Sequence, residues 1–172
     1  MNRIDEILVA LRRVIRATDL HSKHLAKTTG LTAPQMLLLQ TIRDNGEVTI
    51  GEIAQEMSLS QATVTTILDR LEKKNLVFRE RSKEDKRKVH AYLTDEAMSL
   101  LIDAPLPLQD HLARQFNDLP EWEQTMLISS LQRVAHMMNA EHIDASPVLD
   151  VGTIDRHAPQ EDNKGMYEAD KK

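Results

Sequence analysis

The sequence has no cysteine, few aromatic residues and few glycines, and each shortage excludes a kind of chemistry. Without cysteine among its 172 residues, the chain can form no disulfide framework, thiol nucleophile or thiol-based redox sensor. Aromatic residues make up only 3%, so aliphatic side chains must fill the core. The 5 glycines are scattered at turns and form no phosphate-cradling loop.

Long hydrophobic runs are also lacking. The first residues, MNRIDEILVALRRVIR, are interrupted repeatedly by arginine, aspartate and glutamate, so they predict neither a signal peptide nor a membrane span. We therefore expect a cytoplasmic protein with no membrane partner. The length suits one folded domain, alone or followed by a tail.

The charge is unevenly distributed along the chain. The formal net charge is -5, yet residues 60–93 hold nine basic residues against five acidic ones, a net of +4. Residues 140–172 hold eight acidic residues against four basic ones, a net of −4. A basic segment inside an acidic chain is expected where the partner is a phosphate backbone.

Hydrophobic periodicity divides the chain into helices and one hairpin. Apolar residues at three- and four-residue spacing predict helices over 3–29, 33–45, 51–57, 60–74, 95–117 and 121–138, with a break or kink between Pro105 and Pro107. Thr32, Ser60 and Thr94 are placed to cap three of them. Alternating residues predict two strands, 76–81 and 88–93, joined by the charged loop SKEDKRK.

Helix, short turn, helix and hairpin follow one another in the order of a winged helix-turn-helix domain. The predicted fold class is therefore mainly α with a small β wing. The winged helix-turn-helix covers about residues 32–94, and helices 3–29 and 94–139 would form a dimerisation region. Residues 140–172 are acidic and poor in large apolar side chains, which predicts a disordered or loosely docked tail.

The helix 60–74 and the charged loop carry the candidate site. Burial of Val64, Ile67, Leu68 and Leu71 would turn the polar face of this helix toward base edges or phosphates in a major groove. The loop cations would neutralise phosphates or enter a minor groove. The candidate DNA-binding residues are Ser60, Gln61, Ala62, Thr63, Thr65, Thr66, Arg70, Lys83, Asp85, Lys86, Arg87 and Lys88.

Two motifs resemble the MarR family of bacterial winged-helix regulators, and the resemblance covers roughly residues 3–139. Asp85-Lys-Arg87 followed by Leu93-Thr94 is similar to the family's wing signature, and VTIGEIAQEMSLSQATVTTILDRLEKKNLVFRERS is similar to its helix-turn-helix. The resemblance implies that Arg87 enters a minor groove, that Asp85 orients it, and that helix 60–74 is the recognition helix. Thr66 stands where many relatives have a basic residue, so the resemblance implies no guanine contact there.

The resemblance also implies a homodimeric repressor that binds double-stranded DNA at an inverted repeat, with room for a small-molecule or ionic effector at the junction of the dimerisation and DNA-binding regions. ILVALRRVIRATDLHSKHLAKTTGLT resembles regulators of ectoine biosynthesis, which implies control of osmotic-stress genes. Two alternatives stay open: a regulator of the response to drugs or phenolic compounds, and a winged helix that contacts another protein.

We expect no enzymatic activity, because no nucleophile is paired with a base in the sequence. Residues His21, His24 and His111 could in principle meet at a metal ion, but neither cysteine nor a carboxylate ligand motif accompanies them. The sequence therefore predicts no metal site and no cofactor.

Overall fold

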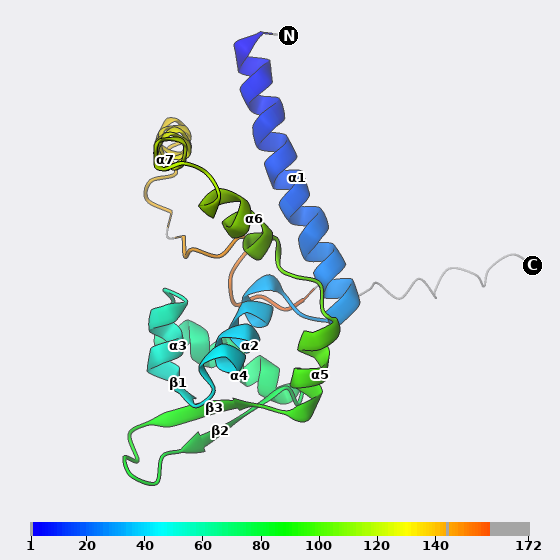
Figure 1. The fold of residues 1–172 in the computed structure, drawn as a ribbon, viewed down its shortest axis with the longest axis vertical. Coiled ribbons are helices and arrows are strands. Elements are labelled where there is room, and N and C mark those ends of the chain that lie inside the picture. The colour runs from blue at the N-terminus through cyan, green and yellow to red at the C-terminus, as the bar shows by residue number, and fades with distance from the viewer. Residues whose placement is uncertain (1, 144, 159–172) are drawn as a thin grey trace, which may run out of the picture.

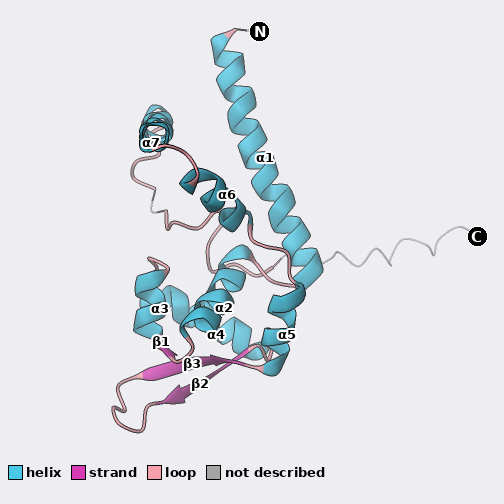
Figure 2. Ribbon diagram, in the orientation of Figure 1, coloured by secondary structure: helices cyan, strands magenta, loops and turns pink. Residues whose placement is uncertain are grey.

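Within residues 2–143 and 145–158, which the computed structural model describes, the chain forms seven helices and three short strands. The elements are α1 (Arg3–Thr29), α2 (Ala33–Asn45), β1 (Val48–Thr49), α3 (Ile50–Glu56), α4 (Gln61–Lys73), β2 (Val77–Arg81), β3 (Val89–Leu93), α5 (Asp95–Asp103), α6 (Leu108–Asn117) and α7 (Glu121–Met137). Figure 2 shows a mostly helical molecule with a small sheet at one end. The predicted fold class is confirmed.

Side-chain caps fix where most helices begin. Capping boxes, in which two side chains each accept a backbone N–H of the other residue, start α1, α2 and α3. The Ser60 and Thr94 hydroxyl oxygens cap α4 and α5 by accepting one backbone N–H each, from Thr63 and Ala97, as the sequence predicts. Each such cap typically stabilises a helix by about 1 kcal/mol. At the other end of α1, Gly30 adopts the left-handed conformation (φ 70°) that favours glycine.

The sheet has three antiparallel strands in the order β1-β3-β2. The predicted hairpin is confirmed as β2 and β3, whereas the third strand, β1, is not predicted from the sequence. Val48 pairs with Ala91 and makes β1 an edge strand of two residues. A strand this short has no alternation that could reveal it from sequence.

One hydrophobic core lies between α2, α3, α4 and the sheet. The end of α1 and the start of α5 reach this core through Leu25 and Ala97, which are fully buried. In contrast, α6 and α7 contain no buried residue. The winged-helix part is thus complete within one chain, whereas the outer helices have apolar faces without cover.

These uncovered faces are extensive. In Figure 1, α1 projects away from the winged-helix domain, and α6 and α7 lie at the same end of the molecule. Ile4 is 65% exposed, and Leu131 is 64% exposed. Further large apolar residues exposed on α1 and α7 are Ile7, Leu8, Val9, Val14, Ile15, Leu20, Trp122, Met126, Leu127, Ile128 and Met137.

Residues 145–158 are docked, which is one of the two alternatives that composition predicts for the tail. This segment runs back from α7 and lies against α1 and α6 (Figure 1), where Asp150 and Leu149 make polar contacts with Ser22 and Gln109. Ile154 packs against the core. Specific contacts therefore hold a segment that is poor in apolar residues. Residues 144 and 159–172, which complete the predicted tail, lie outside the described residues.

Candidate nucleic-acid interface

The candidate recognition helix α4 buries one face and presents the other. Val64, Ile67, Leu68 and Leu71 are fully or almost fully buried, as predicted from their spacing. Ser60 accepts a hydrogen bond from the Thr63 N–H at 3.0 Å, so its hydroxyl fixes the first turn. The remaining candidate residues of this helix are exposed in the case of Gln61 and Ala62, and half-buried in the case of Thr63, Thr65, Thr66 and Arg70.

Two of these side chains, those of Thr66 and Arg70, interact with or are enclosed by their own domain. The Thr66 hydroxyl donates a hydrogen bond to the Ala62 carbonyl at 3.0 Å. Arg70 is half-buried, and its Nη1 has no hydrogen-bond partner among the described residues although it is shielded from solvent. The Arg70 side chain is thus partly enclosed at the edge of the apolar stripe, next to the buried Leu71.

The wing consists of β2, the loop 82–88 and β3. Its loop is ordered by its own polar groups: Ser82 donates its N–H to the Lys88 carbonyl at 3.0 Å and accepts the Asp85 N–H at 3.2 Å. Asp85 accepts the Arg87 backbone N–H at 3.0 Å. The Asp85 carboxylate therefore orients the backbone of Arg87, and the Arg87 guanidinium remains available on the loop.

Four cations stand on this loop, and all of them are exposed: Lys83, Lys86, Arg87 and Lys88. None forms an ion pair within residues 2–143 and 145–158. Their charge is therefore available to an external anion. Behind them, Ala91 of β3 is fully buried, and Val89 and Leu93 on the same face are half-buried. This face of β3 therefore anchors the wing to the domain.

The recognition helix and the wing share one groove. A hollow of about 360 Å³ is lined by Gln61 and Thr65 of α4, by Arg87 and Lys88 at the base of the wing, and by the start of α3. Gly51 of α3 lies so close to α4 that a Cβ there would meet Gln61 Nε2 at 3.5 Å. The structure thus brings together candidate residues from two elements that are separate in sequence.

Lys83 and Asp85 lie on a different side. They line a second hollow of about 460 Å³ whose other charged residues are Glu47, Glu80, Arg81, Glu84 and Lys88, so groups of both signs surround them. Tyr92 donates to Glu47 at 2.9 Å, and this hydrogen bond raises the pKa of the tyrosine. Tyr92 also stacks on Phe78, with ring centroids 5.3 Å apart. The neighbouring His90 side chain is only 15% exposed.

A residue that sequence reasoning did not identify connects α4 to the wing. Arg79 of β2 donates through Nη2 to Asp69 of α4 at 2.7 Å and contacts Glu72 one turn further along the helix. Its pKa is raised, first by the hydrogen bond to Glu72. The only sequence sign of this contact is the pair of carboxylates three residues apart on one helix face.

Other kinds of site find no support among the described residues. No group of three histidine, aspartate or glutamate side chains in this part of the chain is placed to hold a metal ion. Instead, His21 contacts the Leu106 carbonyl at 3.0 Å. As for membranes, none of the helices within residues 2–143 and 145–158 is long and apolar enough to cross one.

Comparisons with known proteins agree with this geometry. The model of the MarR family matches residues 31–89. The uncharacterized HTH-type transcriptional regulator YsmB of Bacillus subtilis is 26% identical over 138 residues, which cover 80% of this chain and 94% of that protein. The HTH-type transcriptional regulator MgrA of Staphylococcus aureus is 35% identical over 80 residues, 46% of this chain and 54% of that protein.

Solved structures extend the likeness beyond the matched segment. A MepR-like protein complexed with pseudoligands superposes with a TM-score of 0.57 at 25% identity, covering 80% of this chain and 97% of that one. A mutant MarR from E. coli complexed with operator DNA gives a TM-score of 0.53 at 25% identity, covering 78% and 99%. The chain is thus a winged-helix protein. Its residues 31–89 are similar to the MarR family.

Proposed function

We propose that this chain is a dimeric, sequence-specific DNA-binding transcriptional regulator and that α4 and the wing form its DNA-reading surface. The observation that carries the proposal is the shared groove, in which Gln61 and Thr65 of the helix lie beside Arg87 and Lys88 of the wing. The relative solved with operator DNA supports it.

The two parts of this surface suit different grooves of a duplex. A helix fits the major groove, where Gln61 and Thr65 offer hydrogen-bonding groups to base edges. Lys86 and Lys88 provide phosphate contacts that do not depend on sequence. Arg87, with its backbone fixed by Asp85, would enter a neighbouring minor groove and favour narrow, A·T-rich sites.

The proposed dimer forms through α1, α6 and α7. Their exposed apolar side chains exceed what a soluble monomer usually leaves uncovered, and a second copy would bury them. A twofold dimer carries two recognition helices, so the operator would be an inverted repeat. Its half-site centres would lie about one helical turn apart, roughly 34–36 Å.

We propose that the protein represses its target genes and that these are osmotic-stress genes. We also propose an effector site at the junction between the dimerisation helices and the winged helix. The likeness of the first helix to regulators of ectoine biosynthesis supports the choice of targets. Deleting the gene should raise transcripts of compatible-solute synthesis at low salt. Unchanged transcripts would contradict this part of the proposal.

The competing function is a winged helix that contacts another protein. Exposed cations on the wing favour DNA, since a phosphate backbone requires them and a protein partner does not. The test is selection of bound duplexes from a random library, followed by affinity measurements on the selected sequence at two salt concentrations. We expect enrichment of an inverted repeat and a steep loss of affinity with salt. Failure to enrich any sequence would refute the proposal.

A matched control separates local from general charge effects. Lys27→Ala removes an exposed cation from α1, outside the proposed surface. It should keep wild-type affinity for the selected duplex, whereas Lys88→Ala should weaken binding at both salt concentrations. Equal losses in the two variants would mean that only the overall charge matters.

A further inference from the structure

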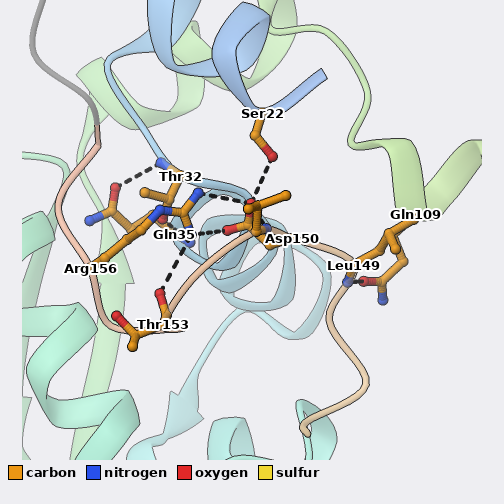
Figure 3. Close-up of polar contacts among 9 residues, drawn as sticks. Ser22, Thr32, Gln35, Gln109, Leu149, Asp150, Thr153 and Arg156 are labelled. Atoms are coloured by element: carbon orange, nitrogen blue, oxygen red, sulfur yellow. Dashed lines mark hydrogen bonds and ion pairs between the residues drawn. The ribbon is translucent and has the colours of Figure 1, made fainter. Parts of the chain in front are cut away.

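Residues 145–158, here called the C-terminal strap, cross between the outer helices and the winged-helix domain. Figure 3 shows the strap passing beside α1 and the start of α2, with Leu149 reaching Gln109 of α6. The Leu149 N–H donates to Gln109 Oε1 at 3.0 Å. Ser22 of α1 donates to Asp150 Oδ1 at 2.7 Å. The strap therefore contacts two helices that are far apart in sequence.

An ion pair inside the strap closes it into a loop. Arg156 donates to both carboxylate oxygens of Asp150, at 2.6 and 2.9 Å. The Asp150 side chain is 0% exposed and that of Arg156 is 22% exposed. Gly152 lies between them with φ 91°, and a Cβ there would meet Arg156 Cδ at 3.3 Å. The turn that brings the pair together thus favours glycine.

A buried pair with two hydrogen bonds differs from an ordinary surface pair. Loss of one partner leaves the other charge without compensation in a place that water reaches poorly. In this strap, loss of Arg156 would leave Asp150 with Ser22 and the Val151 N–H as its remaining donors. The Asp150–Arg156 ion pair is here called the lock. It either keeps the strap closed into its loop or, when one of the two residues is lost, lets the strap open.

Of the two helices that the strap joins, α1 also reaches the core through Leu25, whereas α6 has few other contacts. α6 contains no buried residue, and its polar contact with α2, from Gln40 to Asp110, is long at 3.5 Å. On the domain side, Ile154 of the strap packs against the hydrophobic core. The strap is thus anchored in the winged-helix domain and holds α1 and α6 from there.

We propose that Asp150 and Arg156 are positioning residues that fix the outer helices relative to α4, and so set the separation of the two recognition helices in the dimer. The inference rests on the proposed function and deepens it, since that separation decides which half-site spacing fits. With the lock open, each winged helix would sample a range of positions. Affinity for the best operator would fall, and discrimination between spacings would be lost.

The first measurement needs no DNA. Because the chain has no cysteine, Lys73→Cys on α4 and Gln115→Cys on α6, both exposed, give two unique spin-label sites. Labelled chains diluted with unlabelled protein report the distance within one chain. We expect a narrow distance distribution in the wild-type background and a broad one with Asp150→Asn or Arg156→Gln. A distribution that stays narrow in folded variants overturns the inference.

Two controls separate the lock from general effects on the strap. Asp155→Asn removes an exposed carboxylate from the same segment and should leave the distribution narrow. The double variant Asp150→Asn/Arg156→Gln should broaden it no more than either single change, because one lock is opened in each case. Additive broadening, or unfolding of every variant in thermal melts, would reject a positioning role in favour of a structural one.

The second measurement uses the operator obtained by selection. Wild-type protein should bind it more tightly than a version with one extra base pair between the half-sites, and Asp150→Asn should lose this discrimination. Retained discrimination in Asp150→Asn overturns the inference. If wild-type protein binds no duplex, the proposed function fails, and the spin-label distances alone decide whether the strap holds the helices.

Discussion

Arg79 of β2 and Asp69 of α4 are joined by a hydrogen-bonded ion pair of 2.7 Å between the Nη2 and Oδ1 atoms. Glu72 on the next turn shares the same guanidinium. The contact links the recognition helix to the wing and offsets part of the negative charge of two carboxylates on α4. Partly exposed pairs of this kind contribute about 0.2–1 kcal/mol to stability, so the larger consequence concerns binding.

Arg79→Gln should weaken operator binding more than the loss of one cation explains. Asp69 and Glu72 would then face the duplex without compensation, and the wing would lose a tie to α4. Fluorescence anisotropy at low and moderate salt would measure the loss, which should be larger at low salt. Arg81→Gln is the matched control, because it removes an exposed cation from the same strand. Equal losses in both variants would mean that the link has no role.

Lys86→Ala and Arg87→Ala should affect DNA binding in different ways. Lys86→Ala should weaken binding uniformly across sequences and reduce the salt slope by about 1. Arg87→Ala should also remove the preference for A·T-rich flanks, at a cost of about 1–3 kcal/mol. Affinities for the operator and for flank-substituted operators measure both effects. Wild-type binding to every duplex by a folded Arg87→Ala protein would refute the assignment of the wing.

The start of α3 should lose stability in acid. The Thr49 N–H, which donates to Glu52 Oε2 at 2.8 Å, holds the pKa of Glu52 below its usual 4.5. A depressed pKa in the folded state means that the charged carboxylate stabilises the fold above 4.5 and that this contribution disappears as the pH falls through the folded-state pKa. Urea unfolding of wild type and Glu52→Gln should differ at pH 7.

That difference between wild type and Glu52→Gln should close on acidification, because a protonated glutamate and a glutamine are both neutral. Titration of the free energy of unfolding from pH 7 to below 4.5 provides the check. The same gap at every pH would show that the charge of Glu52 does not stabilise the helix start.

Dimerisation should depend on the apolar face of α7. Leu131→Glu places a charge on a residue that is 64% exposed in one chain and that we propose to be buried by a second copy. Light scattering at micromolar concentration should give twice the chain mass of 19.6 kDa for wild type and about one chain mass for the variant. Gln132→Glu, a polar neighbour, should remain a dimer. A monomeric wild type would contradict the proposed assembly.

Local preferences explain why much of the fold could be predicted from the sequence. Ser60, Thr32 and Thr94 were identified as caps because a hydroxyl before an apolar stripe satisfies the first free N–H groups of a helix. Asn75, which follows α4, has φ 58°, a left-handed conformation that asparagine tolerates. Within α4, the buried stripe follows from three- and four-residue spacing alone.

Contacts between distant residues explain what could not be predicted. β1 pairs two residues with a strand some forty positions away, and so short a strand carries no pattern of its own. Ser22 meets Asp150 across 128 positions, a contact that composition, which predicts a disordered or loosely docked tail, cannot specify. The role of Arg79 is not predicted because its partners, Asp69 and Glu72, lie on α4, and only the fold shows that β2 returns beside that helix.

The most direct test of the DNA-reading surface is a hydroxyl-radical footprint of wild-type protein on the selected operator. The account predicts two protected segments related by a twofold axis, with centres roughly 34–36 Å apart, and flanking minor-groove protection that disappears with Arg87→Ala. Protection of a single asymmetric half-site, or flanking protection that persists without the Arg87 side chain, would contradict it.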